Sequence, residues 1–348
     1  MTPKNVLVVG GVGYIGSHVA RLLLRTGHRV SVLDDLSSCD PRNLQVLSSL
    51  AGADFQFCRC DIRDEKKVQG FVEMARPEII FHIAGLKDAS ESFQDAARYH
   101  AVNVGGTENL VESADRIGVE RFVFSSSAAV YGATGLAPIT ECHPTVPISP
   151  YGETKLLGES LVKAWAKQAP SDRRAIIMRY FNPCCRHPDF VYPKAFPKLG
   201  SANLADAILG VVAGDQPQLT IFGNAHPTPD GTCQRDFVHI EDIAQAHIAA
   251  IHKPANALET VEILNIGSGA TRSVLEFITE FERISGVAIP CSWGPMRVGD
   301  AATSVADVSH TQLCLDWRPS MNLSHICLGL VKHMELAQNT RPRKYTSQ

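Results

Sequence analysis

The sequence VLVVGGVGYIG, residues 6–16, has the pattern of a buried strand, a tight turn and the start of a helix. Its glycines Gly10, Gly13 and Gly16 are spaced three residues apart, and glycine permits positive φ angles and close approach of a ligand to the backbone. The N–H groups and the dipole at the N-terminus of the following helix attract negative charge. The stretch therefore predicts a turn that binds a pyrophosphate.

The same alternation of β-rich runs and helical patterns continues through the first half of the chain. Strands are expected at 6–9, 29–33, 55–58, 78–82, 121–125 and 175–179, and helices at 16–25, 65–74, 94–117 and 151–168. A βαβ rhythm is typical of a parallel sheet with right-handed crossovers. The fold class predicted is α/β, a Rossmann-type doubly wound parallel sheet of at least six strands.

The pattern changes after Asn182. Prolines interrupt regular structure, and Gly/Pro/Asn clusters recur at 223–231. We expect mostly loops and short helices there, forming a smaller C-terminal substrate lobe beside the rigid sheet. The chain is accordingly divided into a Rossmann domain of residues 1–182, to which it returns around 236–266, and a lobe of residues 183–348 whose tail, 340–348, is expected to be disordered.

Composition excludes several classes of protein. The chain has 348 residues, is 45% hydrophobic and 20% charged, and carries a formal net charge of −3. This balance gives no electrostatic footprint for nucleic acid or for an anionic membrane. Its apolar runs are far shorter than the roughly 20 residues of a membrane span, and the polar residues 2–5 leave no room for a signal peptide. We expect a cytoplasmic protein.

The ten cysteines contain no C-x-x-C pair, and a chain of this length is not a small disulfide-stapled domain. Free thiols are expected. Cys184 and Cys185 are adjacent, so their side chains diverge in most backbone conformations and joint metal ligation is awkward. No metal site is expected.

Acidic residues follow the second and third predicted strands. Asp34 lies eighteen residues after Gly16, where an acid binds a ribose 2′-hydroxyl; the alternative is a tight turn with an exposed acid. Asp35 adds a second negative charge that would repel a 2′-phosphate, so NAD is favoured over NADP. Asp61 has two roles open to it, a hydrogen bond to the adenine amino group or the N-cap of a helix over 63–74.

Ser125–Ser127 follow a predicted strand, and Tyr151 and Lys155 lie four residues apart at the start of a predicted helix, on one face of it. To act as a base near neutrality, a tyrosine of reference pKa near 10 needs a differential stabilisation of about 4 kcal/mol. A lysine ammonium nearby provides roughly 2.8 kcal/mol, so a positive nicotinamide ring and the helix N-terminus must contribute the rest. Taken alone, a Tyr-x-x-x-Lys spacing is more often a surface helical pair.

Together these features resemble the UDP-glucose 4-epimerase family of the extended short-chain dehydrogenase/reductase superfamily. The resemblance spans nearly the whole chain. Its most specific segments are GGVGYIGSH (10–18), HIAGLKDASES (82–92), FSSSAAVYG (124–132), PYGETK (150–155), RYFNP (179–183), IFGNAHPTPDG (221–231) and RDFVH (235–239).

The resemblance implies the roles of individual residues. Ser127 hydrogen-bonds the sugar O4, Tyr151 is the base, and Lys155 binds the nicotinamide ribose. The implied cofactor contacts are Gly10, Gly13, Tyr14, Ile15, Gly16, Asp34, Asp35, Asp61, Ile62, Ala84, Gly85, Lys87, Asn103, Ser125, Tyr151, Lys155 and Tyr180. The implied substrate contacts are Lys87, Ser127, Tyr151, Asn182, Asn203, Leu204, Phe222, Arg235, Arg297, Asp300 and Ser304.

Several of these residues have a simpler reading when taken singly. Arg235 and Arg297 suit a diphosphate because guanidinium groups offer planar multiple donors, but Arg235 next to Asp236 also fits a plain ion pair. Phe222, implied to pack beside uracil, also fits a core residue, and Asn182 a loop turn residue. Their ordered co-occurrence favours the functional reading.

The family implies an NAD-dependent 4-epimerase of UDP-hexoses, forming a homodimer through the helices near 94–117 and 151–168. Tyr151 removes the 4-hydroxyl proton while hydride leaves C4 for NAD, and the 4-keto sugar turns over and receives the hydride on its other face. A 4,6-dehydratase is the nearest rival, but Ala128-Ala129 stands where it needs an acid pair. A non-catalytic NAD-binding regulator has no need of Ser127, Tyr151 and Lys155 together.

The chain departs from the family pattern at three places. Asp35 stands where asparagine is common, residues 184–190 replace a smaller loop that contains glycine, and residues 191–201 diverge. At the sugar-pocket wall the family has either a bulky tyrosine or a small residue, and here Ser304 is small. We therefore expect UDP-GlcNAc and UDP-GalNAc to be accepted alongside UDP-glucose and UDP-galactose.

Overall fold

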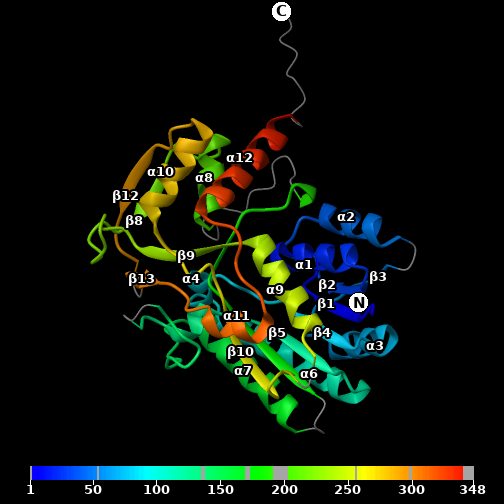
Figure 1. The fold of residues 1–348 in the computed structure, drawn as a ribbon. Helices are drawn as coiled ribbons and strands as arrows, with labels where there is room; N and C mark the ends of the chain where they lie inside the picture. The colour runs from blue at the N-terminus through cyan, green and yellow to red at the C-terminus, as the bar shows by residue number, and fades with distance from the viewer. Residues whose placement is uncertain are drawn as a thin grey trace, which may run out of the picture.

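The computed structural model describes residues 2–52, 55–134, 138–168, 173–190, 203–254, 257–297 and 300–339. At its centre lies a seven-stranded sheet in the order β10-β6-β5-β4-β1-β2-β3 (Figure 1), and every neighbouring pair is parallel. The Rossmann-type sheet predicted from the sequence is confirmed. Its strands are β1 (Asn5–Val9), β2 (Arg29–Asp34), β3 (Gln56–Arg59), β4 (Ile79–His82), β5 (Arg121–Ser127), β6 (Arg174–Tyr180) and β10 (Val261–Ile266).

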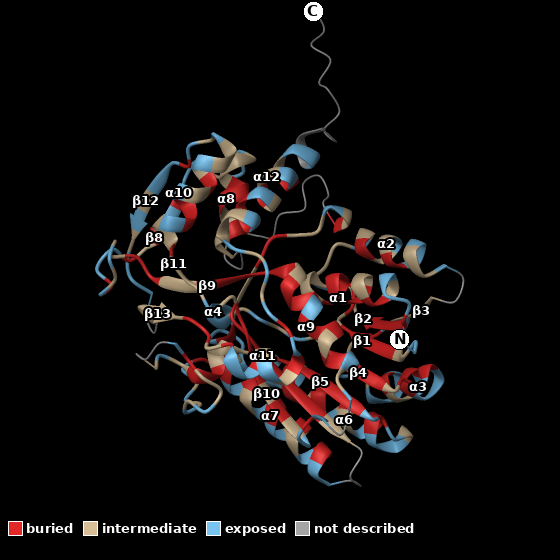
Figure 2. Ribbon diagram, viewed as in Figure 1, coloured by how far each residue is buried: buried red, intermediate tan, exposed pale blue. Residues whose placement is uncertain are grey.

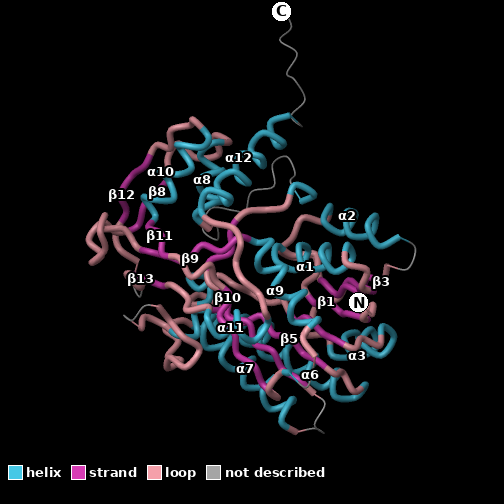
Figure 3. Tube along the Cα trace, in the orientation of Figure 1, coloured by secondary structure: helices cyan, strands magenta, loops and turns pink. Residues whose placement is uncertain are grey.

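Helices cover both faces of this sheet (Figures 1 and 3). Side chains alternate along a strand, so β1 contributes Val6 and Val8 to one apolar cluster and Leu7 and Val9 to another. Figure 2 shows the strands as an almost continuous buried layer between the helices. The first face carries α1 (Tyr14–Arg25), α2 (Arg42–Ala51) and α9 (Ile240–His252), and the second carries α3 (Glu65–Ala75), α6 (Gly106–Ile117) and α7 (Pro150–Lys167).

The helix expected over 94–117 is interrupted, so that prediction was wrong in detail. The short helix α4 (Ala89–Ser92) precedes α5 (Ala96–His100), and a π-helical turn, Ala101–Gly105, separates α5 from α6. Single π-turns of this kind occur often at functional sites. The turn carries Asn103, whose buried side chain bonds to other parts of the chain, as described below.

A second lobe contains two small sheets and a helical layer. The four-stranded sheet comprises β7 (Asn182–Cys184), β9 (Gln234–His239), β11 (Thr271–Ser273) and β13 (Thr303–Ser304), and the two-stranded sheet comprises β8 (Leu219–Phe222) and β12 (Cys291–Gly294). Its helices α8 (Leu204–Val212), α10 (Val274–Ser285) and α12 (Leu323–Asn339) lie together at one end of the molecule (Figure 3). Short helical turns lie at Ala128–Tyr131 and Pro188–Phe190, and α11 spans Ser309–Leu315.

The expectation of mostly loops and short helices after Asn182 was wrong. Helices α9, α10 and α12 have 13, 12 and 17 residues. α10 begins with a complete capping box, in which the Ser273 hydroxyl accepts from the Glu276 N–H and the Glu276 carboxylate accepts from the Ser273 N–H, a local start signal that the early prolines obscured. The divergent stretch 191–201 and the tail 340–348 lie outside the described residues.

The chain crosses back to the central sheet after β9. Helix α9 packs on α1, and β10 extends the sheet by pairing with β6 from Val261 to Ile266. Within the described ranges, none of the helices combines the length and the apolar character that crossing a membrane demands.

Buried histidines make the fold sensitive to acid. Burial lowers the pKa of His18 and His82 to about 3 and that of His247 to about 4, against an ordinary value of 6.5. Below that value the unfolded chain binds these protons and the folded chain does not, so stability falls as the pH falls. The expected slope is about 1.4 kcal/mol per pH unit for each histidine.

Urea unfolding at pH 6.5 and at about pH 5 measures this slope. His82→Gln should flatten it, whereas the same change at the exposed His100 should leave it as in the wild type. Equal stability of the wild type at the two pH values would contradict the expectation.

Candidate active site

The glycine-rich turn between β1 and α1 is as tight as the sequence predicts. Gly10 has φ +78°, and a Cβ there would lie 2.6 Å from the Ala84 nitrogen, while a Cβ at Gly16 would lie 2.0 Å from the Gly10 oxygen. Gly13, the N-cap of α1, offers no side chain to the first N–H groups, and the first turn has no acidic residue. The N-terminus at Tyr14 and Ile15 therefore suits an anion, and the residues present fit a dinucleotide diphosphate.

Asp34 ends β2 beside this turn and is buried. Its carboxylate accepts hydrogen bonds from the N–H groups of Val12 at 2.9 Å and Leu36 at 2.8 Å. Each oxygen keeps a further lone pair for a ribose hydroxyl. Burial raises the pKa of Asp34, with a smaller contribution from Asp35, and the backbone bonds oppose the rise.

The two other acids have local partners. Asp35 accepts from the N–H and hydroxyl of Ser37. Asp61 pairs with the Arg63 guanidinium at 2.6 Å, and the N-cap of α3 is Asp64, so the alternative reading of Asp61 as a helix cap was wrong.

Ser127, Tyr151 and Lys155 meet where β5 ends and α7 begins. Ser149 caps α7 through the Gly152 N–H, and Pro150 occupies its first turn, which fixes the approach of the helix to the strand. Lys155 is buried and its Nζ donates to the Ser125 carbonyl at 2.9 Å.

Burial and one hydrogen bond set the acidity of these side chains. Burial raises the pKa of Tyr151, and the hydrogen bond with Ser127 opposes that rise. The Ser127 oxygen already accepts from the Ala129 N–H at 3.1 Å, which leaves its own proton for Tyr151 or for a substrate oxygen. Burial lowers the pKa of Lys155 to about 8. These residues alone hold Tyr151 protonated at neutral pH, so its activation needs a further positive charge.

The hydrogen-bond partner of Tyr180 is His247 of α9, and the sequence analysis did not predict it. The Ser125 hydroxyl lies 2.7 Å from the Tyr180 hydroxyl, which lies 2.9 Å from His247 Nε2. His247 Nδ1 faces the Ile243 carbonyl at 2.9 Å and so carries the proton, leaving Nε2 to accept from Tyr180. The chain of bonds fixes Tyr180 at the end of β6. No local spacing could have revealed it.

A buried ion pair behind the site was missed too. Glu159 of α7 accepts from Arg179 of β6 at 2.8 and 2.7 Å, and also from Ser126 at 2.7 Å. Burial raises the pKa of Glu159, but the bonds and charge of Arg179 outweigh burial and hold the pKa below its usual value. Arg179 also donates to Tyr131 at 3.0 Å. The pair ties α7, and with it Tyr151 and Lys155, to the central strands.

The segment that follows β4 packs against the glycine-rich turn, since Ala84 lies next to Gly10. Asn103 accepts from the Leu86 N–H at 2.8 Å and donates to the Leu86 carbonyl and to Thr154 Oγ1, each at 3.0 Å. Its amide therefore holds the segment containing Ala84, Gly85 and Lys87 against α7. Ile62 packs in the apolar cluster that contains Leu7 and Val9 of β1, close to Gly106.

Five predicted substrate residues lie close together in the sequence or structure of the second lobe. Three are on strands β8, β9 and β13, and two are in the segment between β12 and β13. The Arg297 guanidinium lies 4.0 Å from the centre of the Phe222 ring. Arg235 pairs with Asp300 and also donates to the Ala301 carbonyl at 2.8 Å. Ser304 is the register partner of Arg235 in the parallel pair of β13 and β9, so both side chains lie on one face.

The simpler reading of Arg235 was wrong, because its neighbour Asp236 bonds elsewhere. The buried Asp236 carboxylate accepts from Ser268 N–H and hydroxyl, each at 2.6 Å, from Gly269 N–H at 3.0 Å and from Ala306 N–H at 3.1 Å. Asp236 thus supports the loops around the candidate site, while Arg235 points to Asp300.

Three predicted residues begin elements of the second lobe. Asn182 starts β7 opposite Phe237 of β9. Asn203 is the N-cap of α8, and its side chain accepts from the Asp206 N–H at 2.9 Å. Leu204 packs against the apolar cluster of that lobe.

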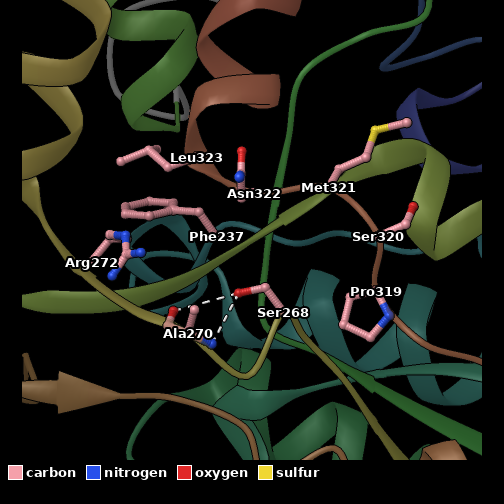
Figure 4. A pocket seen from close by; sticks show the side chains of 9 residues that line it. All are labelled: Phe237, Ser268, Ala270, Arg272, Pro319, Ser320, Met321, Asn322 and Leu323. Atoms are coloured by element: carbon pink, nitrogen blue, oxygen red, sulfur yellow. Dashed lines mark hydrogen bonds between the residues drawn. The ribbon is translucent and has the colours of Figure 1, made fainter.

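A separate cavity of about 180 Å³ lies between β9, β11 and the 319–323 segment (Figure 4). Its polar lining is modest: Arg272 lies near Phe237, and Ser268 bonds to the Ala270 backbone at 3.2 Å. It contains none of Ser127, Tyr151 and Lys155, and it belongs to the second lobe. The nine lining residues are Phe237, Ser268, Ala270, Arg272, Pro319, Ser320, Met321, Asn322 and Leu323.

Comparison with known proteins agrees with this geometry. Residues 6–267 match the model of the NAD dependent epimerase/dehydratase family. The chain is 39% identical over 327 residues to a UDP-glucose 4-epimerase of Neisseria meningitidis serogroup C, covering 93% of this chain and 95% of that protein.

Solved structures with similar folds agree as well. A UDP-glucose-4-epimerase from Stenotrophomonas maltophila, with bound NAD and formylated UDP-arabinopyranose, superposes with a TM-score of 0.88 at 34% identity, covering 97% of this chain and 100% of that one. The UDP-Glc/GlcNAc 4-epimerase of Campylobacter jejuni superposes with a TM-score of 0.80 at 32% identity, covering 96% and 99%. The chain therefore belongs to the NAD dependent epimerase/dehydratase family.

Proposed function

We propose that this chain interconverts UDP-galactose and UDP-glucose by NAD-dependent 4-epimerisation, and that it also interconverts their N-acetylated counterparts. The observation that carries the proposal is the meeting of Ser127, Tyr151 and Lys155 at the end of β5. They lie on the sheet edge that also bears the glycine-rich turn, where ligands of open α/β sheets bind. The relatives at 36–39% identity are UDP-glucose 4-epimerases.

The residues divide the chemistry among them. NAD, held by the glycine-rich turn and Asp34, would supply the hydride acceptor for C4 of the sugar and the hydride donor for the return to that carbon. Tyr151 takes the proton of the 4-hydroxyl group, and Ser127 donates a hydrogen bond to the same sugar oxygen, O4. Lys155 supplies positive charge beside the nicotinamide ribose. The 4-keto sugar then turns within the pocket while Arg235 and Arg297 hold its diphosphate. Net oxidation is zero, so the cofactor need not leave between turnovers.

The alternative of a 4,6-dehydratase gains no support from the structure. Water elimination needs an acid/base pair just after the catalytic serine. Ala128 and Ala129 occupy that position, at the start of the short helix after β5, and neither side chain can exchange a proton.

The purified protein tests the proposal directly. Denaturing release followed by chromatography should yield NAD or NADH, because the charges of Asp34 and Asp35 repel a 2′-phosphate. A coupled assay should show UDP-galactose converted to UDP-glucose without added cofactor. Mainly NADP in the released fraction would overturn the cofactor assignment, and absence of conversion would overturn the activity.

The breadth of sugar specificity rests on Ser304. Its place opposite Arg235 leaves a small side chain where a tyrosine would narrow the pocket. Ser304→Tyr should abolish conversion of UDP-GalNAc while sparing UDP-galactose, since overpacking costs on the order of 1–3 kcal/mol or more. Ser304→Ala should keep both activities. A wild-type protein that converts UDP-galactose and shows no activity on UDP-GalNAc would refute this role of Ser304.

We further propose a homodimer formed through the helices at 94–117 and 151–168. Leu157 within the second segment is 45% exposed, and Phe93, the residue directly before the first segment, is 65% exposed; exposed apolar surface of this kind favours association. Light scattering coupled to gel filtration measures the mass. A monomer at micromolar concentration would contradict the proposal.

We also propose that the protein acts in the cytoplasm. All ten cysteines have free thiols. Reducing compartments keep thiols in this state.

A further inference from the structure

The loop at residues 184–190, which departs from the family pattern, docks along α1 from Tyr14 to Arg21. The Tyr14 hydroxyl donates to the Cys185 carbonyl at 2.5 Å, and the His187 N–H donates to His18 Nε2 at 2.9 Å. Arg21 of α1 pairs with Asp189 at 2.8 Å. The loop is thus fixed on both sides of Arg186.

Cys185 adopts φ +76°, a conformation that favours glycine. The strain is tolerated because the side chain is buried in the second lobe's core, beside Gly329. The backbone on the N-terminal side of Arg186 is therefore held in one conformation, which aims the arginine at α1.

Two cations lie over the ring of Tyr14, the first residue of α1. The Arg186 guanidinium carbon is 5.0 Å from the ring centre, and Lys87 Nζ is 5.6 Å from it. The side chain of Lys87 is exposed, yet partial desolvation by its surroundings lowers its pKa and the charge of Arg186 lowers it further, against the opposing charges of Asp206 and Asp88. Because both cations lie near the same Tyr14 ring, they repel each other.

Neither cation forms an ion pair with a carboxylate in the part of the chain that the structure describes. Asp206 acts on Lys87 from a longer range, and Asp40 is paired with Arg42 at 2.5 Å. The stretch 191–202 that follows the loop contains no Asp or Glu. Two cations held together without a paired carboxylate favour an anion between them.

The place of the pair indicates which anion it takes. Tyr14 opens α1 directly after the glycine-rich turn, where the N–H groups have no side-chain cap. We propose that Arg186 acts with Lys87 as a cationic ligand for a nucleotide diphosphate at this helix N-terminus. The inference rests on the proposed function, which supplies two such groups, the diphosphate of NAD and that of the UDP-sugar. A guanidinium suits either because it offers planar, multiple donors to phosphate oxygens.

Binding measurements on the NAD-loaded protein test the proposal without turnover. The variants are Arg186→Gln, which removes the charge, and Arg186→Lys, which keeps it. Arg29→Gln is the matched control, since Arg29 is exposed at the opposite, amino end of the sheet. One arm follows the loss of NAD during gel filtration at raised salt, and the other measures the Kd of UDP by calorimetry.

Arg186→Gln should accelerate NAD loss or weaken UDP binding about tenfold or more, as expected for a charge-assisted contact. Arg186→Lys should recover most of that loss, and Arg29→Gln should match the wild type. A change confined to NAD loss assigns the cofactor diphosphate, and one confined to UDP assigns the substrate diphosphate. Wild-type behaviour of Arg186→Gln in both arms overturns the proposal, as does equal impairment of the Gln and Lys variants, which would indicate packing alone. An inactive wild type would refute the epimerase function and leave these binding results standing.

Discussion

Tyr151→Phe should lower turnover of UDP-galactose by at least about 100-fold, the usual contribution of a positioned general base. The substitution removes only the hydroxyl. Ser127, whose hydrogen bond opposes the rise in the pKa of Tyr151, keeps its hydroxyl in this variant, but an aliphatic hydroxyl is a far weaker acid than a phenol and cannot replace it as the base. UDP affinity should survive, because Arg235 and Arg297, the residues proposed to hold the diphosphate, are unchanged. The coupled assay and calorimetry with UDP measure the two effects.

Tyr99→Phe is the matched control. The ring of Tyr99 lies 6.5 Å from that of Tyr151, but its hydroxyl has other partners: it donates to Glu91 at 2.8 Å and accepts from the Asp88 N–H at 3.1 Å. This variant should keep its turnover. Near-normal epimerisation by Tyr151→Phe would show that the base has been misassigned.

Glu159→Leu should destabilise the protein by about 3–5 kcal/mol, because it leaves the buried Arg179 guanidinium without its carboxylate. The side chains of the pair are 0% and 3% exposed. The double variant Glu159→Leu/Arg179→Met should recover most of the loss, since replacing a whole buried pair by apolar groups is often close to neutral. Urea unfolding at neutral pH measures both.

An exposed pair provides the control for that experiment. Arg283 and Glu280 lie 2.8 Å apart, with the Arg283 side chain 64% exposed, and Arg283→Ala should change the free energy of unfolding far less than Glu159→Leu does. If Glu159→Leu were as mild as Arg283→Ala, the buried pair would not be what ties α7 to the central strands.

The parts of the fold that the sequence predicted correctly are those encoded by short-range spacing. The turn at residues 10–16 and the strand rhythm up to β6 depend on neighbours in sequence, as does the placement of Tyr151 and Lys155 on one helical face. The return of the chain to the sheet around 236–266 was expected as well, but the bounds of β10 and α9 were not predicted.

The parts that the sequence left out depend on contacts between distant residues. His247 reaches Tyr180 from 67 positions away, and Asn103 reaches Thr154 from 51. Neither has a spacing signal, and the π-helical turn that presents Asn103 is not distinguishable from α-helix by periodicity. The ion-pair reading of Arg235 with Asp236 failed for the same reason, because both side chains take partners far along the chain.

The central claim is that hydride leaves C4 of the sugar and returns to the same carbon, with Tyr151 handling the hydroxyl proton. UDP-galactose carrying deuterium at C4 tests it most directly, with the UDP-glucose formed by the purified protein analysed by mass spectrometry and NMR. The product should keep its deuterium at C4. Loss of the label to water during conversion would contradict it, because that result requires removal of the C4 hydrogen as a proton.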